Sequence, residues 1–506
     1  MRSKFFQSLS ILAGLFLALS FWNIGLNWFI WFGFSPFLIV IEREDNPRRL
    51  IINSVLCGLI FFSLSLYWIC YVSFLGVIFL VGYLLIYFVL FSICIRFLYR
   101  IKVINSVNQF FVIPSVWVML EYLRSHLFSG FGWASLGYCQ YLNLHFIQIA
   151  ELTGVYGVSF LIILVNIFIK EFVLNVKSIV LFDKRYLKRF ILVSLITLSC
   201  ILAVYTYGDV KLNNKIEGRE LTISVIQGNI PQHQKWQPFY RNLIFEKYKK
   251  LTRMASFDRP DIIIWPETSL PGYLDEEDLF REISGLAKEI EKPLLIGAAT
   301  IGEDKDVYYN SACLISKDGS LEGVYNKIHL VPFGEYLPLP FIFGFIDNMY
   351  EIAGWTKGKE YTLFDIKGNK FGVLICFEDI FSDLVRDFIN QGADFMLNIT
   401  NDAWFGRSPE AYQHLQASVF RAVENRVNIV RAANTGVSCF IDPYGRVIDR
   451  VSSKNEDIFI QGYKTQTIFI KEMDTFYTRF GDLFVLLCFF LTIIYLLKGF
   501  VFKARL

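Results

Sequence analysis

Eight apolar segments, each about as long as a membrane-spanning helix, most constrain the fold of this 506-residue chain. A helix needs about 20 mostly apolar residues to cross the hydrocarbon core of a bilayer. We predict spans near residues 5–21, 24–41, 51–70, 75–95, 110–127, 155–174, 190–207 and 483–500. The chain as a whole is 54% hydrophobic and only 19% charged, which is too apolar for an ordinary soluble protein. The sequence therefore predicts a polytopic α-helical membrane domain.

Basic residues predict how these spans are oriented. Lysine and arginine accumulate in cytoplasmic loops. They cluster after the second, fourth and sixth predicted spans, at 43–49, 96–102 and 177–189, and Arg2 and Lys4 begin the chain. This alternation predicts a cytoplasmic N-terminus and places the region from about 215 to 475 on the outer face of the membrane. The expected domains are N-terminal membrane helices over 1–210, an outer domain over 215–475, and a C-terminal helix with a cytoplasmic tail over 480–506.

The outer region alternates short apolar strands with amphipathic helices, which predicts a layered α/β sandwich. We expect strands at 221–227, 262–265, 294–298, 311–316, 372–376, 395–399, 428–432 and 438–442. We expect helices at 239–255, 276–290, 382–391 and 409–425. Periodicity alone does not separate a sandwich from a doubly wound sheet.

Three of the apolar strands run into a residue that can take part in catalysis. The run at 371–375 ends at Cys376, with Glu378 close behind, and similar runs lead to Glu267 and Lys327. A base, a cation for an oxyanion and a thiol are what acyl transfer through cysteine requires. Taken alone, a cysteine after an apolar run is usually a small buried hydrophobe. The two matching strand ends favour a catalytic role for Cys376.

These motifs resemble the nitrilase (carbon-nitrogen hydrolase) superfamily over about residues 220–470, and within it the apolipoprotein N-acyltransferase family. The likeness lies in Trp-Pro-Glu-Thr at 265–268, Pro-Phe-Gly-Glu-Tyr at 332–336 after Lys327, and Asn-Asp-Ala-Trp-Phe-Gly at 401–406. Motifs at 121–124, 130–133 and 137–140 extend the resemblance into the membrane half. The resemblance implies an αββα sandwich for the outer domain and a catalytic triad of Glu267, Lys327 and Cys376.

The resemblance also implies a reaction. Cys376 would take a fatty acyl chain from a phospholipid as a thioester and pass it to the α-amino group of a diacylglyceryl-cysteine apolipoprotein. Such a ping-pong transfer is the last step of bacterial lipoprotein maturation. It implies a multi-pass protein of the bacterial inner membrane whose catalytic domain is periplasmic.

Two other functions are alternatives. A membrane-anchored nitrilase-type amidase would use water as the final acceptor, but a hydrolase of small amides needs no platform of eight spans. A transporter with an inactive outer domain would carry charged or broken helices near mid-membrane, and the sequence indicates few. It would also leave the three motifs unexplained.

Five further site residues carry over from the family motifs: Glu335, Glu378, Phe377, Trp236 and Trp404. The resemblance gives the two glutamates a role in supporting the triad and places the two tryptophans near the lipid entry. The alternatives are a surface or structural carboxylate for each glutamate and core packing for each tryptophan. The family usually has tyrosine directly after the cysteine, so at Phe377 any role of that hydroxyl is either absent or filled by another residue. We expect the ring to be what is required.

Composition and spacing argue against several partners. A net charge of +3 without a basic, aromatic-interleaved stripe gives no sign of nucleic-acid binding. No CxxC or clustered Cys/His spacing indicates a metal site, so we expect neither metal nor cofactor. Nine cysteines, several of them inside apolar runs, indicate no disulfide framework. One chain carries all the expected parts, which predicts a monomer.

Two further segments carry hypotheses. Glu121 and Arg124 lie one helical turn apart in the fifth span, where they either pair or extend to the membrane surface. The apolar segment 337–345 lacks a helix or strand pattern. We predict that it is a mobile lid over the acyl region, with an irregular core segment as the alternative.

Overall fold

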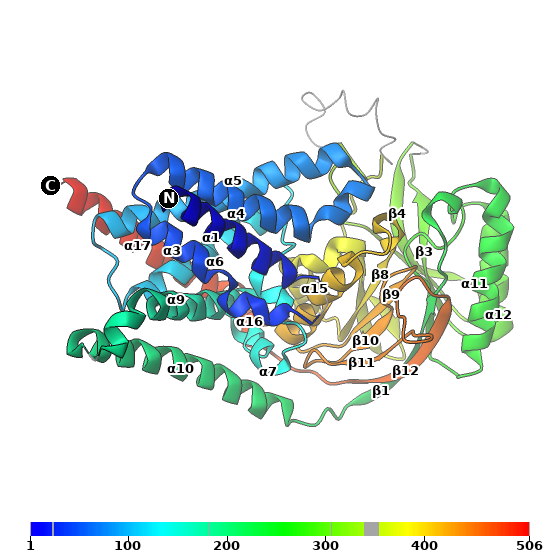
Figure 1. Cartoon of the computed structure of the whole chain (residues 1–506). Helices are drawn as coiled ribbons and strands as arrows, with labels where there is room; N and C mark the ends of the chain where they lie inside the picture. The colour runs from blue at the N-terminus through cyan, green and yellow to red at the C-terminus, as the bar shows by residue number, and fades with distance from the viewer. Residues whose placement is uncertain (1, 23–24, 182, 305, 338–353, 505–506) are drawn as a thin grey trace. The chain divides into compact units, whose positions relative to one another are not determined.

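The computed structural model of the chain describes residues 2–22, 25–181, 183–304, 306–337 and 354–504 (Figure 1). These residues form two compact units. The first, here called the helical unit, comprises Met1–Asn214 and Thr475–Leu506, and the second, the sandwich unit, comprises Lys215–Asp474. The predicted lid at 337–345 lies outside the described residues, apart from Leu337.

Long apolar helices build the helical unit. They are α1 (Arg2–Leu19), α4 (Pro47–Ser65), α5 (Phe74–Arg100), α6 (Gln109–His126), α9 (Val155–Val180), α10 (Lys184–Leu212) and α17 (Leu483–Ala504). Helix α1 packs against α4, α4 against α5, and α6 against both α9 and α17. In the described part of the chain, five helices are long and apolar enough to cross a membrane: Pro47–Ser65, Phe74–Arg100, Val155–Val180, Tyr186–Leu212 and Leu483–Val501. The prediction of a polytopic membrane domain is confirmed, and five of the predicted spans coincide with these helices.

The other three predicted spans agree with the observed helices to different extents. Helix α1 covers residues 5–19 of the predicted 5–21, and its apolar part, Ser3–Leu19, is shorter than the five helices above. Helix α6 covers residues 110–126 of the predicted 110–127 and contains Pro114, Glu121 and Arg124. The segment 24–41 is not a single helix, so this prediction is wrong. Its described residues form η1 (Asn27–Phe29), α2 (Ile30–Gly33) and part of α3 (Ser35–Arg43). A total of eight spans stays a prediction.

Asn166 of α9 stabilises the break between α2 and α3. Its Oδ1 accepts hydrogen bonds from the backbone N–H groups of Phe34 and Ser35, both at 2.9 Å, and its Nδ2 donates to the carbonyl of Ile30 at 2.9 Å. Irregular backbone at membrane depth is tolerated where the protein itself satisfies the polar groups. Hydropathy could not predict the break, because the residue that satisfies it lies more than 130 positions away in the sequence.

Two six-stranded sheets form the centre of the sandwich unit. The first has the order β12-β1-β2-β3-β4-β5 and the second β11-β10-β9-β8-β7-β6. The first contains β1 (Arg219–Gln227), β2 (Ile262–Ile264), β3 (Leu294–Ile301), β4 (Tyr308–Ile315), β5 (Leu321–Asn326) and β12 (Gly462–Ile470). The second contains β6 (Phe364–Ile366), β7 (Asn369–Ile375), β8 (Phe395–Thr400), β9 (Ile429–Ala433), β10 (Cys439–Ile441) and β11 (Val447–Arg450). The sheets meet face to face, with β1 near β9 and β4 near β7.

Helices cover the outer face of each sheet. Helices α11 (Arg241–Ser256) and α12 (Glu277–Ile290) pack on the first sheet, and α14 (Ser382–Asn390) and α15 (Glu410–Asn425) on the second (Figure 1). Helix α11 buries Ile244, Tyr248 and Leu251, whose spacing forms one helical face, in the same apolar core as Trp265. The predicted αββα sandwich is therefore confirmed. Strand β12 was not predicted, because its burial is mostly intermediate and lacks a clear alternation.

Strand pairing determines where the candidate site residues emerge. Strands β7, β8 and β9 are parallel, with Ile375 opposite Ile399, so their carboxyl ends lie at one edge of the second sheet. Cys376 follows β7 directly. In the first sheet Glu267 lies just beyond β2, and Lys327 follows β5 directly. Polar residues at the ends of buried strands are the usual location of sites in such sheets.

Candidate active site

Cys376 lies on a strained turn between β7 and the short 3-10 helix η6 (Cys376–Ile380). Its φ of 57° is in the left-handed region, which costs a residue with a side chain about 1–2 kcal/mol. The surrounding structure maintains this conformation. The Cys376 carbonyl accepts hydrogen bonds from Asn398 Nδ2 at 2.9 Å and His414 Nε2 at 3.2 Å. Strain of this kind gathers at functional sites.

Lys327 brings two glutamates together. Its Nζ lies 2.8 Å from Glu335 Oε1 and 3.7 Å from Glu267 Oε1, and its side chain is buried. Asn310 Nδ2 donates to the same two oxygens, at 2.8 Å to Glu267 and 3.1 Å to Glu335. The structure therefore holds the carboxylates of Glu267 and Glu335 around one buried ammonium group. Sequence analysis missed Asn310, which lies inside β4 and carries no motif.

Charges within this group set the protonation states of Lys327 and Cys376. Burial alone would lower the pKa of Lys327, but Glu335, Glu267 and the Cys376 group outweigh it and raise the pKa. Desolvation raises the pKa of the Cys376 thiol well above its usual value, and Glu267 raises it further while Lys327 opposes the shift. At neutral pH the lysine is therefore charged and the resting thiol protonated. A protonated thiol needs a base before it can act as a nucleophile.

Glu378 ties the Lys327 loop to the end of β7. The carboxylate accepts hydrogen bonds from the backbone N–H groups of Ile328 at 2.7 Å, His329 at 2.9 Å and Ile375 at 2.7 Å, and from the Tyr325 hydroxyl. Burial raises the pKa of Glu378 to about 7. Because Glu378 is fully buried, the alternative of a surface carboxylate is wrong for this residue.

The three predicted aromatic residues lie in different environments. The Phe377 ring lies under the Lys327 ammonium, with Nζ 5.4 Å from the ring centroid. Trp236 and Trp404 are 46% and 51% exposed, so the alternative of core packing is wrong for both. Lys235, beside Trp236, is buried and donates to the Glu267 carbonyl at 2.8 Å. Burial lowers the pKa of Lys235 to about 8, opposed by Glu267 and Cys376. Sequence analysis missed Lys235, for which proximity to Trp236 was the only signal.

A buried ionic cluster adjoins Cys376. His414 of α15 places Nδ1 3.1 Å from Asp402 Oδ1 and Nε2 3.0 Å from Asp379 Oδ1, and Arg431 Nη1 lies 2.7 Å from Asp379 Oδ2. Burial alone would lower the pKa of His414, but Asp379 and Asp402 outweigh it and raise the pKa to about 10. His414 is therefore an imidazolium, with a proton on each nitrogen.

The same cluster has a spacing that would suit a metal ion, since ligand atoms of Asp402, Glu410 and His414 lie within 4.8 Å of one another. Binding a metal requires a neutral imidazole with a free lone pair. The two carboxylates facing His414 favour the protonated ring, and a protonated ring has no free lone pair for a metal. In this arrangement His414 acts as a hydrogen-bond donor.

Removing the arginine from this cluster should strongly destabilise the sandwich unit. Arg431→Met leaves the buried Asp379 without its guanidinium, and breaking a buried pair on one side costs about 3–5 kcal/mol. Thermal unfolding of the purified protein in detergent should show a clearly lower midpoint. Arg407→Met is the matched control, because Arg407 pairs with Glu456 at the surface and such pairs contribute about 0–1 kcal/mol. Equal shifts for the two variants would contradict the prediction.

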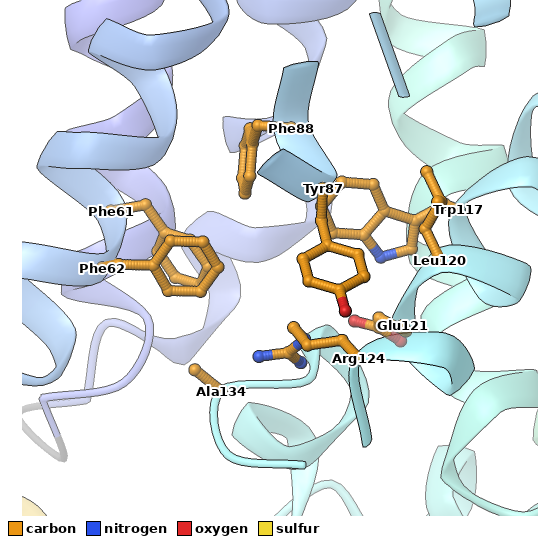
Figure 2. A pocket seen from close by; sticks show the side chains of 9 residues that line it. All are labelled: Phe61, Phe62, Tyr87, Phe88, Trp117, Leu120, Glu121, Arg124 and Ala134. Carbon is orange, nitrogen blue, oxygen red and sulfur yellow. The ribbon is translucent and has the colours of Figure 1, made fainter. Parts of the chain in front are cut away.

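The helical unit has a polar group of its own. Glu121 and Arg124 line a pocket with the aromatic side chains of Phe61, Phe62, Tyr87, Phe88 and Trp117 (Figure 2). Both charged residues are 3% exposed, so extension to the membrane surface is wrong. Glu121 Oε1 accepts from the N–H of Leu136 at 2.7 Å, and Arg124 donates to the Trp133 carbonyl and to Ser135 Oγ. The two side chains hold the loop at 133–136 in place.

Comparisons with known proteins cover both units. Two family models match the chain: the apolipoprotein N-acyltransferase N-terminal domain over residues 13–168 and carbon-nitrogen hydrolase over residues 222–468. An apolipoprotein N-acyltransferase of Geobacter metallireducens is 36% identical over 95% of this chain and 92% of the relative. One of Rickettsia bellii is 33% identical over 76% of this chain and 75% of the relative. Among solved structures, Saccharomyces cerevisiae Nit3 of the nitrilase superfamily is 17% identical, with a TM-score of 0.39, and covers 50% of this chain and 92% of that structure.

Proposed function

Since this chain belongs to the apolipoprotein N-acyltransferase family, and is thus an acyltransferase that acts on lipoproteins, we propose that Glu267, Lys327 and Cys376 carry out the transfer through a thioester. The observation that supports this proposal is the buried group of Glu267, Lys327 and Glu335, which interacts electrostatically with the protonated Cys376 thiol. Together, Glu267, Lys327 and Cys376 provide a base, a fixed cation and a nucleophile.

In the first half-reaction Glu267 takes the thiol proton as Cys376 Sγ attacks the ester carbonyl of a phospholipid. A carbon–sulfur bond forms, and the carbonyl oxygen becomes an oxyanion. Lys327 and the backbone N–H of Phe377 stabilise this charge. Collapse breaks the carbon–oxygen ester bond, and the departing lysophospholipid oxygen takes the proton from Glu267. Preorganised donors of this type contribute about 10²–10³ in rate each.

In the second half-reaction the α-amino group of a diacylglyceryl-cysteine apolipoprotein attacks the thioester carbonyl. An amide bond forms as the carbon–sulfur bond breaks. Glu267 accepts a proton from the amine and returns it to the sulfur. Because the environment of Cys376 raises its thiol pKa, the free enzyme is regenerated in its protonated form.

The proposal includes the setting of the reaction. Apolar helices in the helical unit and basic residues after alternate spans support a multi-pass protein of the bacterial inner membrane, with residues 215–475 as a periplasmic catalytic domain. Membrane domains over 1–210 and 480–506 would bring the phospholipid donor and the lipid-anchored acceptor to the same leaflet. One chain carries every proposed catalytic group, which supports action as a monomer.

Mass spectrometry of the purified protein tests the proposal directly. After incubation with phospholipid and no acceptor, the Cys376 peptide should carry a hydroxylamine-labile fatty acyl group. A diacylated lipopeptide should discharge this adduct, whereas water should not. Discharge by water alone would indicate a hydrolase, and absence of an adduct on the folded protein would refute the thioester mechanism. Cys376→Ser, which lacks the thiol, is the control for assignment of the adduct.

The Phe377 ring should matter more than the missing hydroxyl. Phe377→Tyr keeps a ring under the Lys327 ammonium and should transfer acyl chains at nearly the rate of the unmodified protein. Phe377→Leu removes a cation–π contact of about 0.5–2 kcal/mol, which corresponds to a loss of about 2- to 30-fold. Initial rates of lipopeptide acylation measure both effects. A similar loss in both variants would show that the ring itself is not what the site uses.

A further inference from the structure

We propose that His414, together with Asn398, is a positioning residue that fixes the peptide between Cys376 and Phe377 so that the Phe377 N–H faces the developing oxyanion. The proposal rests on the thioester reaction described above. It assigns a role to the buried ionic cluster, which that reaction does not otherwise use.

Two side chains hold the carbonyl oxygen of Cys376. It accepts hydrogen bonds from two buried side chains on different elements, Asn398 Nδ2 of β8 at 2.9 Å and His414 Nε2 of α15 at 3.2 Å. Neither bond belongs to a sheet ladder or to a helix. Two dedicated donors on a single carbonyl oxygen specify the direction in which that carbonyl points.

Peptide geometry transmits this direction to the next residue. A trans peptide is planar, and its C=O and N–H groups point in opposite directions. Pinning the Cys376 carbonyl toward His414 and Asn398 therefore directs the Phe377 N–H away from the ionic cluster. Because Phe377 is the second residue of η6, its N–H has no acceptor within that helix. It remains available to an oxyanion formed at Cys376.

The cluster holds His414 rigidly in its role as donor. Asp402 Oδ1 lies 3.1 Å from Nδ1, and Asp379 Oδ1 lies 3.0 Å from Nε2, the nitrogen that donates to the Cys376 carbonyl. Arg431 and Ser418 both contact the far oxygen of Asp379. A neutral histidine has one N–H and would lose one of these partners. The pair of carboxylates thus ensures that Nε2 carries a hydrogen for the carbonyl.

The peptide after Cys376 needs fixing because no sheet ladder or helix holds its carbonyl. Its orientation depends on ψ of Cys376 and φ of Phe377, and Cys376 already has a φ of 57°, in the left-handed region, where the surrounding structure must determine the conformation. If the peptide flips, the Cys376 carbonyl replaces the Phe377 N–H at the oxyanion. The site then loses one donor and gains a repulsive dipole.

Two reactions of Cys376 distinguish a positioning role of His414 from a role in stabilising the fold alone. Acylation by p-nitrophenyl acetate forms a carbon–sulfur bond and an oxyanion, then expels p-nitrophenolate as Glu267 takes the thiol proton. Alkylation by iodoacetamide also forms a carbon–sulfur bond and expels iodide, but it passes through no oxyanion. In His414→Gln, single-turnover acylation should fall by about 10²–10³, the usual effect of losing one oxyanion donor. Alkylation, followed on the Cys376 peptide over a range of pH, should reach the same maximal rate as in the unmodified protein.

Two variants complete the test. Asn398→Leu removes the other donor to the same carbonyl without changing the charge of the cluster, so it should show the same selective loss even if His414→Gln fails to fold. Ser284→Ala removes a hydrogen bond to the Gly319 carbonyl, and Ser284 belongs neither to the ionic cluster nor to the Cys376 site, so both reactions should continue at nearly normal rates. Equal losses of acylation and alkylation would show a merely structural role. Unchanged acylation in both His414→Gln and Asn398→Leu would also overturn the proposal. The ester assay involves neither phospholipid nor lipopeptide, so a failure of the proposed lipid substrates would be recognised separately.

Discussion

Cys376→Ala should abolish acyl transfer, with a loss on the order of 10⁴-fold or more, as expected when a covalent nucleophile is removed. The methyl group cannot form a thioester, and no neighbouring side chain in the described residues offers a second thiol. Cys313, on β4 of the same unit, is fully buried, and burial raises its pKa. The measurement is the appearance of triacylated lipopeptide from phospholipid and diacylated lipopeptide, quantified by mass spectrometry.

Cys313→Ala is the matched control for this result. It removes a buried thiol from the same sandwich but should leave transfer intact, because Cys313 does not contact the Glu267 and Lys327 group in any recorded interaction. Both variants should show cooperative unfolding close to that of the unmodified protein. Transfer that survives in a folded Cys376→Ala protein would contradict a thioester intermediate.

Glu267→Gln should reduce acyl transfer by about 10²–10⁴, the usual contribution of a general base. The substitution preserves shape, and the remaining amide oxygen can still accept the hydrogen bond from Asn310. Lys327 Nζ keeps its ion pair with Glu335 Oε1, 2.8 Å away, so the ammonium group remains charged. Loss of rate would therefore report loss of the base rather than collapse of the site. The first-order rate of Cys376 acylation by phospholipid is the appropriate measurement.

The pH dependence of this variant gives a sharper test. Without a base, reaction requires thiolate formed by ionisation, and desolvation keeps the pKa of Cys376 above its usual value even when the contribution of Glu267 is removed. The rate should therefore rise about tenfold per pH unit below that pKa, and the deficit relative to the unmodified protein should shrink as pH rises. Glu289→Gln, at an exposed salt bridge with Arg253, should change neither rate nor profile. A deficit that stays constant with pH would exclude Glu267 as the base.

The strands that lead to the candidate site were predictable because their signal is local. The apolar residues before Cys376 and before Glu267 indicate buried strands whatever their neighbours are, and both strands are buried. Strand β5 before Lys327 is mostly exposed or half-buried, and the sequence before Lys327 is less apolar. The type of residue that follows each strand then indicates which catalytic role it can take. The supporting glutamates and Phe377 came from the family resemblance, and the structure adds their contacts: Glu378 with three backbone N–H groups, and Phe377 with Lys327.

The sequence by itself determined the membrane character, the layered α/β character of the outer domain and the strands that end near Cys376 and Glu267, because hydrophobic length and periodicity are properties of neighbouring residues. The αββα class came from the family resemblance. Only the tertiary structure decided which distant groups meet. Asn310 reaches both glutamates from β4, and His414 and Asn398 converge on one carbonyl from a helix and a strand. Asn166 replaces helical hydrogen bonds more than 130 residues away. Each of these contacts satisfies a buried polar group through the packing of separate elements, and no local pattern encodes that packing.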